Sequence, residues 1–573
     1  MLISYLTYLF KYLLLYTYSY FLGRAFLIFL SYKIFKYKEI PKSILFCKSG
    51  VAYPLIGLIF LGNLLFILNF IFPISSDIII FFAFILLLPN FFNLDINFKK
   101  YLNFEYFFNY ILIPSILVIS IWDTSYNYDA GYYHLLNQAW FRDSNLIVGM
   151  VNIFWPFGIS SIYEYISAFL WIDKTFVLLH FIDLIFIHAF YIFLIQNILD
   201  SKYVELKNTS LFILVYSLLD NFGFSAYISK YSNIPILDEM SLGGRNGFIY
   251  IQGVGKQDIP VAILFYVVSV ILLLGIKEKK FKELDLFLIS FFVLFIYQLK
   301  VSGILISFLY LVLIYTIVIN KNIQMKKIIY LNIPIIFFAM TWSVKNLFSS
   351  GCFLFPVSFT CFEGFSWYIK GSTETFEAIT TQASLAYKLG DSFQDWLATA
   401  PSFEFRTEIF LNFLFSIFLL FIIKNLIFNK TNNTGNFSLI LYTFIIINFL
   451  YLLFFGPIPR YAIGICMLTA ASFGFLTNKL RFRLNRVFIY LFIFVSVFLL
   501  PRLASYESFI VNDDLKIFDP RTSNEINYVT GFTSFNENWV FPSEGDQCWA
   551  NTRCTMSKVD IKISKNFFKV AEK

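Results

Sequence analysis

Acidic side chains gather in one polar segment of an otherwise apolar chain. The segment reads WDTSYNYDAGYYHLLNQAWFRD, from Trp122 to Asp143. Asp123 and Asp129 come so soon after an apolar run that at least one of them is expected at the edge of the hydrocarbon layer. Ionisable groups at that depth are costly and tend to be functional, and carboxylates there can accept protons or bind metal ions. This loop is therefore the first candidate site.

Histidine and glutamate near this loop are further candidates for proton or metal chemistry. His134 lies five residues after Asp129, and Glu164 lies in the next stretch, VNIFWPFGISSIYEYISAFLWI. A single hydrogen-bonded histidine is commoner than a metal ligand or a proton relay, so His134 has a structural alternative. His180 and His188 lie in one apolar run, about two helical turns apart, and we expect them to form interhelical hydrogen bonds.

A second acidic group follows a glycine-rich segment, GVGKQDIP. Asp258 precedes Pro260 at the start of an apolar run, so its carboxylate either caps that helix at its positive end or faces the first loop. The glycines do not form a phosphate-binding fingerprint, because no strand-to-helix context surrounds them, and we expect a mobile loop. Both interpretations of Asp258 stay open.

Two cations stand at very short turns between apolar runs, Lys300 in YQLKVSG and Arg460 in PRYAIG. Positive side chains held at the membrane edge beside carboxylates suit the binding of a phosphate that comes from the lipid leaflet. The alternative is that these side chains only extend to the interface. Pro457 and Pro459 fix the turn around Arg460, which favours the binding role for that residue.

The elements that must position these residues are membrane helices. Of the 573 residues, 58% are hydrophobic, 21% aromatic and 14% charged. The charged fraction is far below the roughly 25% that is typical of soluble domains. The N-terminal apolar run lacks a basic start and a small-residue cleavage site, so we expect it to be a retained span. The net charge is +8, and its placement leads us to expect membrane lipids and no nucleic acid as partners.

A window of about 20 apolar residues predicts an all-α polytopic membrane protein with about 14 transmembrane helices (about 12–15). The predicted spans are 3–31, 51–72, 77–94, 104–122, 175–198, 208–221, 258–276, 285–299, 301–319, 329–343, 407–423, 437–455, 461–476 and 487–500. Loops on one side of these spans carry 22 Lys and Arg in 77 positions, and loops on the other side carry 11 in about 160. Basic loops stay in the cytoplasm, which places the longer loops with fewer Lys and Arg residues outside.

This topology divides the chain into six parts of an inner-membrane protein, with the large loops and the C-terminal region in the periplasm. The parts are N-terminal helices (1–122), a first outer loop with interfacial helices and a candidate catalytic aspartate (123–174), central helices (175–343) with a second outer loop (222–257), a third outer loop (344–406), C-terminal helices (407–500) and a small outer C-terminal region (501–573). We expect the stretch around Pro156 and Gly158 to be an amphipathic helix that lies in the membrane interface.

Cysteine positions agree with this topology, because disulfides persist only in oxidising compartments. Cys352 and Cys361 fall in the third outer loop, and Cys548 and Cys554 fall in the C-terminal region. Each pair is close in sequence, so we expect two disulfides, with unpaired thiols as the alternative. Cys47 lies in a predicted cytoplasmic loop, where no pairing is expected.

Five short segments together resemble a known family. YDAGYYHLLNQAW, KQDIPVAIL, LKVSG, VKNLFSSGCFLFPV and PRYAIG follow in this order between Trp122 and about Gly464. An outer loop with an aspartate in a D-A-x-Y context is similar to the GT-C superfamily of integral-membrane glycosyltransferases. The five segments look closest to a bacterial family of multi-pass, GT-C-like membrane proteins. The extra helices before the aspartate loop depart from the simplest GT-C plan, in which that loop follows the first span.

The resemblance implies transfer of a sugar, on the outer membrane face, from a polyprenyl-phosphate-linked donor to a glycan, lipid or protein acceptor. Asp129 matches the family's loop carboxylate and would take the proton of the acceptor hydroxyl in an inverting displacement. Arg460, Lys300 and Lys345 would bind the departing lipid phosphate. A divalent cation, Mg²⁺ or Mn²⁺, between Asp129 and Asp258 is left open. The further acid or metal-ligand candidates are Asp123, Glu164 and His134.

The third outer loop is expected to shape the acceptor site. Its disulfide would hold CFLFPVSFTCF near the membrane, and Trp367, Tyr368 and Trp396 could stack on sugar rings. Ordinary placement of aromatic side chains at the membrane interface is the alternative.

Three rival functions remain. A flippase or exporter of lipid-linked glycans should show charged residues within spans or a repeated half, and charges within the predicted spans are sparse. A lipid-linked polysaccharide polymerase or ligase would rely on a large outer loop with paired arginines, whereas the third loop has only Arg406 at its end. A structural membrane scaffold is the third alternative.

Overall fold

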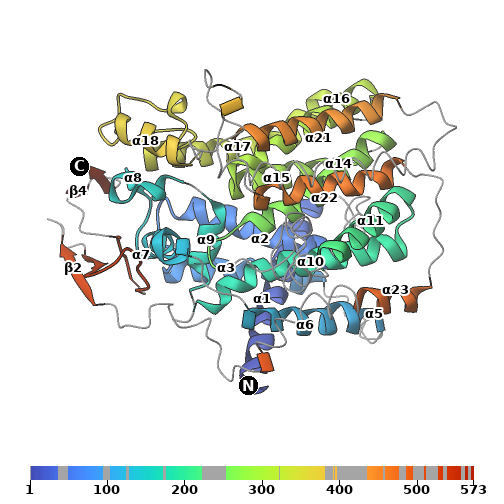
Figure 1. Cartoon of the computed structure of the whole chain (residues 1–573), viewed down its shortest axis with the longest axis horizontal. Helices are drawn as coiled ribbons and strands as arrows, with labels where there is room; N and C mark the ends of the chain where they lie inside the picture. Colours follow the sequence, from blue (N-terminus) through green and yellow to red (C-terminus); the bar gives the residue numbers. More distant parts are fainter. Residues whose placement is uncertain are drawn as a thin grey trace.

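The computed structural model shows a mostly helical protein (Figure 1). It describes residues 2–36, 49–93, 104–123, 128–159, 161–171, 176–221, 253–279, 281–321, 323–380, 392, 394–395, 435–455, 459–476, 485–494, 509–510, 527–532, 538–550, 552–556, 562–565 and 569–572. The helices form because long runs of the chain are apolar on every face, and in lipid a helix satisfies each backbone N–H and C=O internally. The chain is therefore a helical membrane protein.

Seven helices among the described residues are long and apolar enough to cross a membrane. They are Leu2–Ile34, Gly50–Leu68, Phe104–Trp122, Leu178–Asp200, Asp258–Glu278, Val301–Ile319 and Met325–Ser350. Two other predicted spans contain short helices, α3 (Asp77–Ile85) with 9 residues and α23 (Arg486–Ile493) with 8. At a rise of about 1.5 Å per residue, α3 does not reach across about 30 Å of hydrocarbon, and the rest of the span that contains α23 lies outside the described residues. The predicted count of about 14 spans is therefore not confirmed, and the span at 407–423 lies outside the described residues.

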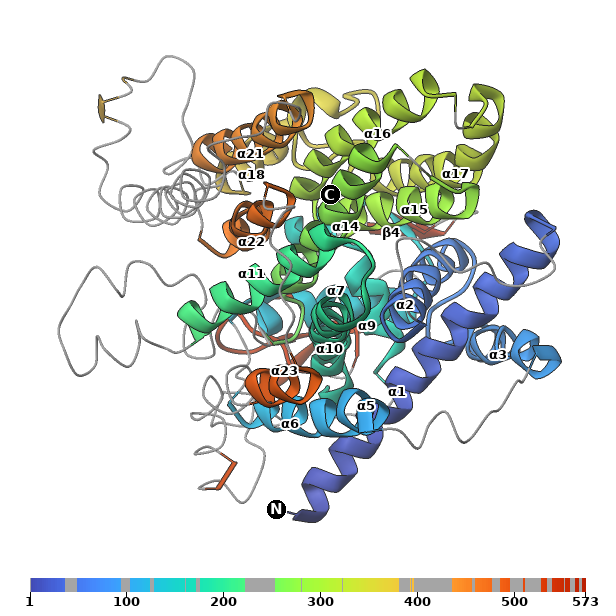
Figure 2. The ribbon, with the colours of Figure 1, turned by 90° about the vertical axis from the view of Figure 1, so that its right-hand side faces the viewer.

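Three helices form the buried centre of the bundle, α10 (Val177–Asp200), α14 (Asp258–Glu278) and α15 (Glu283–Leu299). In Figure 2, α10 and α14 lie in the middle of the other helices. The apolar window of α10 is 100% buried and that of α14 is 94% buried. The windows that contain α16 (Ser307–Ile319) and α17 (Met325–Ser350) are only 28% and 22% buried. Their exposed apolar side chains are suited to contact with lipid, whereas α14 and α15 can carry a site inside the protein.

Close contacts join the N-terminal helices to this centre. α1 (Leu2–Phe29) packs along α2 (Ser49–Leu68), and a Cβ at Gly23 would lie 1.9 Å from a backbone oxygen of α2. Small residues allow two membrane helices to approach this closely. On α10, Nδ1 of His188 lies 2.8 Å from the hydroxyl of Tyr12 on α1. The interhelical hydrogen bond expected for His188 is thus confirmed.

The segment after α7 (Leu135–Asp143) differs from the predicted interfacial helix. It forms β1 (Ile147–Val148), α8 (Met150–Ile153), a 3-10 turn at Trp155–Gly158 and α9 (Ile162–Phe169). Pro156 lies in the 3-10 turn, and Ser161 caps α9 by accepting a hydrogen bond of 3.3 Å from the N–H of Tyr163. All α9 residues up to Ala168 are buried, because the helix packs against α2 and α7. The segment is thus a series of short elements with a buried α9, and its place in the membrane interface stays a prediction.

Five short strands in the described part of the chain add a little sheet to the mostly helical fold, which remains consistent with the predicted all-α membrane protein. The strands are β1, β2 (Tyr528–Phe532), β3 (Asn538–Pro542), β4 (Lys562–Lys565) and β5 (Lys569–Glu572). β2 and β3 form an antiparallel pair, and β5 lies between β1 and β4, with Ile147 opposite Lys569. No strand among the described residues exceeds five residues, and β1 pairs with β5 near the other end of the chain, so no local sequence pattern predicts these strands. The C-terminal strands thus lie beside α7 and α8 at one end of the helices (Figure 1).

Candidate functional site

Asp129 stands at the start of a helix with a widened first turn. The π turn η5 (Ala130–His134) leads into α7. The N–H of Leu135 donates to the carbonyl of Ala130, five residues back, whereas an α-helix would use the residue four back. With this spacing, residues five apart stack one turn above each other, so Asp129 and His134 share one face of the helix. π turns of this kind are frequent at functional sites.

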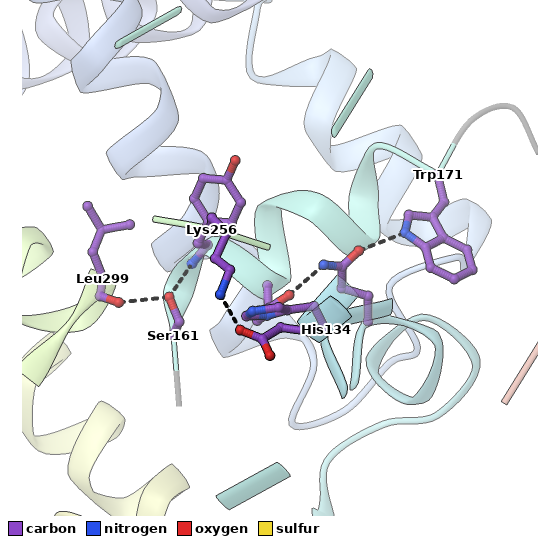
Figure 3. A network of polar contacts seen from close by, with 9 residues as sticks. His134, Ser161, Trp171, Lys256 and Leu299 are labelled. Atoms are coloured by element: carbon purple, nitrogen blue, oxygen red, sulfur yellow. Dashed lines mark hydrogen bonds and ion pairs between the residues drawn. The ribbon is translucent and has the colours of Figure 1, made fainter. Parts of the chain in front are cut away.

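A glycine-rich loop contacts both residues of this face. Lys256 forms an ion pair with Asp129 (Figure 3). The residue before it, Gly255, has φ of +81°, and a Cβ there would lie 2.1 Å from Cγ of His134. Burial would raise the pKa of Asp129, but the hydrogen bond and charge of Lys256 outweigh it and hold the pKa below its usual value. The Asp129 side chain is 34% exposed, so the site offers an ionised carboxylate that a substrate can reach.

A buried chain of polar side chains lies behind His134 (Figure 3). Nδ1 of His134 pairs with Oε1 of Glu164, and the two side chains are 4% and 3% exposed. Gln138 donates to Oε2 of Glu164 over 2.5 Å and accepts a hydrogen bond of 2.9 Å from Nε1 of Trp171. Nε2 of His134 has no hydrogen-bond partner among the described residues. Glu164 therefore orients an imidazole whose second nitrogen can bond a ligand.

Asp258 is held by two cations. Nζ of Lys300 lies 2.5 Å from Oδ1 of Asp258, and Nε of Arg460 lies 3.1 Å from Oδ2. The same Nζ lies 3.3 Å from the ring centroid of Tyr461, and Cζ of Arg460 lies 5.3 Å from it. The carboxylate of Asp258, at 6% exposure, makes both ion pairs, and the N-cap of α14 is the preceding residue, Gln257. The cluster carries one more positive than negative charge.

A cleft opens beside this cluster. Its polar lining consists of Asp258, Lys300, Ser302, Asn448, Tyr451, Arg460 and Tyr461. Its apolar lining consists of Val261, Ala262, Phe265, Gly303, Leu305, Leu452, Gly464 and Ile465. These residues come from α14, the turn after α15, α21 (Gly435–Phe455) and α22 (Pro459–Leu476). A net positive group beside apolar walls is the combination that binds an anion with an apolar tail.

Electrostatic interactions join the helix of Asp129 to this cleft. Burial raises the pKa of Asp129, and the hydrogen bond and charge of Lys256 lower it; the charge of Arg460 lowers it further, by a smaller amount. Burial raises the pKa of Tyr133 well above its usual value, and the charges of Asp129 and Asp258 add to the rise. Tyr133 is therefore in electrostatic range of both carboxylates.

Lys345, predicted to bind the lipid phosphate, does not line the cleft. α17 continues past the predicted end at 343 to Ser350, so Lys345 lies on the helix and not in a loop. Its side chain is 1% exposed. Nζ lies 5.1 Å from the ring centroid of Trp342 and 5.6 Å from those of Phe141 and Tyr165. Aromatic rings therefore surround the amine away from the cleft.

The predicted acceptor-loop aromatics do not line the cleft either. Nε1 of Trp367 donates to a backbone carbonyl of α17 over 3.2 Å, and its ring stacks on Phe365 at 4.5 Å. Tyr368 lies against the glycine that ends α17. Both side chains pack on their own segment, and Trp396 lies outside the described residues. Asp123 ends a 3-10 turn, and its side chain lies outside the described part of the structure.

The candidate carboxylates do not form a metal centre as they are arranged. The described residues contain no group of three or more His, Cys, Asp or Glu side chains that could hold a metal ion. Asp129 and Asp258, the pair expected to bridge Mg²⁺ or Mn²⁺, each bind a lysine. The donor set therefore does not fit a divalent cation.

The structure contains the disulfides Cys352–Cys361 and Cys548–Cys554. The second lies beside the helix of Asp129. The N–H of Cys548 donates to the carbonyl of Gly131 over 2.7 Å, and Nε1 of Trp140 donates to the carbonyl of Cys554 over 2.9 Å. The C-terminal region is thus part of the site's surroundings.

Two features of the site are absent from the sequence-based candidates. Lys256 lies in a segment interpreted only as a mobile glycine loop, although a lysine between glycine and Asp258 was a usable signal. The contact between Trp549 and Gly131 joins distant parts of the chain, and no local pattern indicates it.

Comparison with known proteins places part of the chain in relation to one family. Residues 255–468 match a family described as a domain of unknown function (DUF8201). No curated protein and no solved structure matches the chain. The matched region contains Lys256 and the cluster from Asp258 to Arg460, and it leaves the helix of Asp129 outside. The similarity therefore covers the cationic cleft without assigning it an activity.

Proposed function

We propose that this protein is a GT-C-like integral-membrane glycosyltransferase. It transfers a sugar from a polyprenyl-phosphate-linked donor to a glycan, lipid or protein acceptor at the outer face of the inner membrane. The observation that carries the proposal is the pairing of a reachable, ionised Asp129 with a cleft in which Lys300 and Arg460 share one carboxylate. That cleft has positive charge available for a phosphate and apolar walls for a prenyl chain.

The proposed reaction is a single displacement that inverts the anomeric carbon. Asp129 removes the proton of the acceptor hydroxyl, whose oxygen bonds to the anomeric carbon as the bond from that carbon to the phosphate oxygen breaks. The electron pair goes to the phosphate, where Lys300 and Arg460 stabilise the added charge. Lys256 keeps Asp129 ionised before the substrate arrives, and the acceptor hydroxyl then takes the place of its ammonium group.

His134 and Glu164 have a supporting role in this proposal. Glu164 accepts the hydrogen bond from Nδ1 of His134 and fixes the ring, so Nε2 can bond the acceptor. Because Asp129 and His134 share one helix face, one acceptor can contact both side chains.

A GT-C-type arrangement with about 14 membrane crossings is part of the same proposal. Besides the seven long apolar helices, α11 (Val204–Asn221), α15, α21 and α22 have 17 to 21 residues. Helices of that length can cross a membrane with little tilt. Placement of the site outside is supported by the basic loops on the opposite side and by the two disulfides, which persist in an oxidising compartment.

The test is sugar transfer by the purified full-length protein in lipid nanodiscs. A panel of polyprenyl-phosphate-linked hexoses and pentoses is offered with envelope glycolipids as acceptors, and released polyprenyl phosphate is measured. The wild type should release it, and Asp129→Asn should slow release by about 10²- to 10⁴-fold. Asp77→Asn, at an exposed position on α3, is the matched control and should match the wild type.

Other outcomes point to the rival functions. Equal release by Asp129→Asn and the wild type would contradict the role of Asp129. Movement of intact lipid-linked sugar between leaflets, without release, would indicate a flippase or exporter. Joining of two lipid-linked glycans would indicate a polymerase or ligase.

A further inference from the structure

The π turn at Asp129 has an identifiable cause in the C-terminal region. In an α-helical register, the N–H of Leu135 would donate to the carbonyl of Gly131, four residues back. It donates instead to Ala130, while the carbonyl of Gly131 accepts a hydrogen bond of 2.7 Å from the N–H of Cys548. The C-terminal contact therefore occupies the oxygen that the α register would use.

The segment 546–554 contacts the residues on both sides of Asp129. On the N-terminal side of Asp129, the side-chain amide of Gln547 donates to the carbonyl of Tyr128 over 3.1 Å. On the C-terminal side, the ring of Trp549 covers Gly131 so closely that a Cβ there would lie 2.6 Å from the ring. The Cys548–Cys554 disulfide closes this segment, and its far end accepts the hydrogen bond from Trp140 on α7. We call the described residues of this segment, 546–550 and 552–554, the C-terminal clamp.

The register of this turn decides which side chains meet. Five residues along an α-helix correspond to a rotation of about 500°, so Asp129 and His134 would point about 140° apart. In the π turn they lie on one face, and the adjacent residues Gly255 and Lys256 contact His134 and Asp129 respectively. The same-face arrangement is thus supported by the helix hydrogen bonds and by the loop.

We propose that the C-terminal clamp is a positioning element of the site, which holds the π turn and thereby aligns Asp129 with His134. Cys548 and Trp549 contact Gly131, and they act on the site through that residue. Only the sugar-transfer readout of this inference rests on the proposed function. The alignment of Asp129 with His134 can be tested without sugar transfer.

The alignment is tested by zinc binding to an Asp129→His variant. Two histidines stacked on one helix turn can chelate Zn²⁺, and the other two histidines of the chain, His180 and His188, are fully buried. Zinc titration of the purified full-length protein in nanodiscs should show about tenfold or tighter binding to Asp129→His than to the wild type. Adding Cys548→Ser with Cys554→Ser, or Gly131→Ala, should remove the gain. Equal binding with and without the clamp substitutions, or no gain in Asp129→His alone, would overturn the inference.

Sugar transfer gives the second readout. Gly131→Ala and Trp549→Ala should lower kcat by about 100-fold with little change in the KM for the donor, because the reacting groups are misaligned while the cleft is intact. Gly371→Ala is the matched control, since a Cβ there meets nothing within 4 Å. If one clamp variant fails to fold, the other decides. If Asp129→His binds zinc as expected but the wild type transfers no sugar, the result would count against the proposed function alone. Full kcat in both folded clamp variants would count against the clamp.

Discussion

Nζ of Lys300 lies 2.5 Å from Oδ1 of Asp258 and 3.3 Å from the centre of the Tyr461 ring. Burial lowers the pKa of Lys300, but the carboxylate of Asp258 outweighs it, and the pKa lies above its usual value. The amine therefore stays charged at neutral pH. With Arg460 on the other oxygen at 3.1 Å, one buried carboxylate orders two cations before any ligand arrives.

Loss of either cation should weaken the stabilisation of the departing phosphate. Lys300→Met and Arg460→Met should each lower kcat/KM for the polyprenyl-phosphate-linked donor by about 100-fold. The measurement is release of polyprenyl phosphate at several donor concentrations. Arg486→Met is the control, because Arg486 pairs with Glu105 and Asp200 and lies outside the cleft lining. Equal loss in all three variants would show that surface charge, and not this cluster, binds the donor.

The ion pair of Lys256 and Asp129 should set the acid limit of activity. The lowered pKa of Asp129 keeps the base ionised below the ordinary aspartate value of about 3.9. Any stability from the pair is present above that value and is lost as the pH falls through the lowered pKa. In Lys256→Met, burial dominates and raises the pKa, so the acid limb of the kcat profile should move to higher pH. Lys327→Met, which breaks the more exposed pair with Glu283, should leave the limb unmoved. A shift in both variants, or in neither, would contradict the assignment of Asp129 as the base.

The buried pair of His134 and Glu164 should matter for stability as well as for activity. Glu164→Gln removes a charge that accepts two hydrogen bonds at 3% exposure, which should cost about 1–3 kcal/mol. The melting temperature of the purified protein, followed by intrinsic fluorescence in one detergent, should fall. Glu363→Gln is the control, because Glu363 pairs with Lys370 at 67% exposure and should leave the melting temperature unchanged. An unchanged melting temperature in Glu164→Gln would show that the buried network contributes nothing to folding.

Thiol labelling should report the side of the membrane on which the site lies. Cys352 and Cys361, and likewise Cys548 and Cys554, are disulfide-bonded, so an impermeant maleimide added outside intact cells should label them only after reduction. Cys47 should be labelled only in inverted vesicles, because its loop is basic. Labelling of Cys47 from outside, with protection of the reduced pairs, would reverse the proposed topology.

Several features of the site follow from short-range sequence patterns. Asp129, Asp258, Lys300 and Arg460 can be selected because each charged side chain stands beside an apolar run, where a charge is costly. The structure brings Asp258, Lys300 and Arg460 into one cluster and places Asp129 in electrostatic range of Arg460. The family resemblance also points to Lys345, but α17 extends past the predicted end and buries it among aromatic rings.

The sequence by itself determined that this chain is a helical membrane protein, because long apolar runs with 14% charge cannot stay in water or form open strands in lipid. It also determined which few charged residues are candidates for chemistry. Only the tertiary structure decided how they meet. The turn that aligns Asp129 with His134 depends on a carbonyl of Gly131 that Cys548 binds from the other end of the chain. A local pattern cannot encode that bond, since hydrogen bonding across such a separation depends on how the whole chain packs.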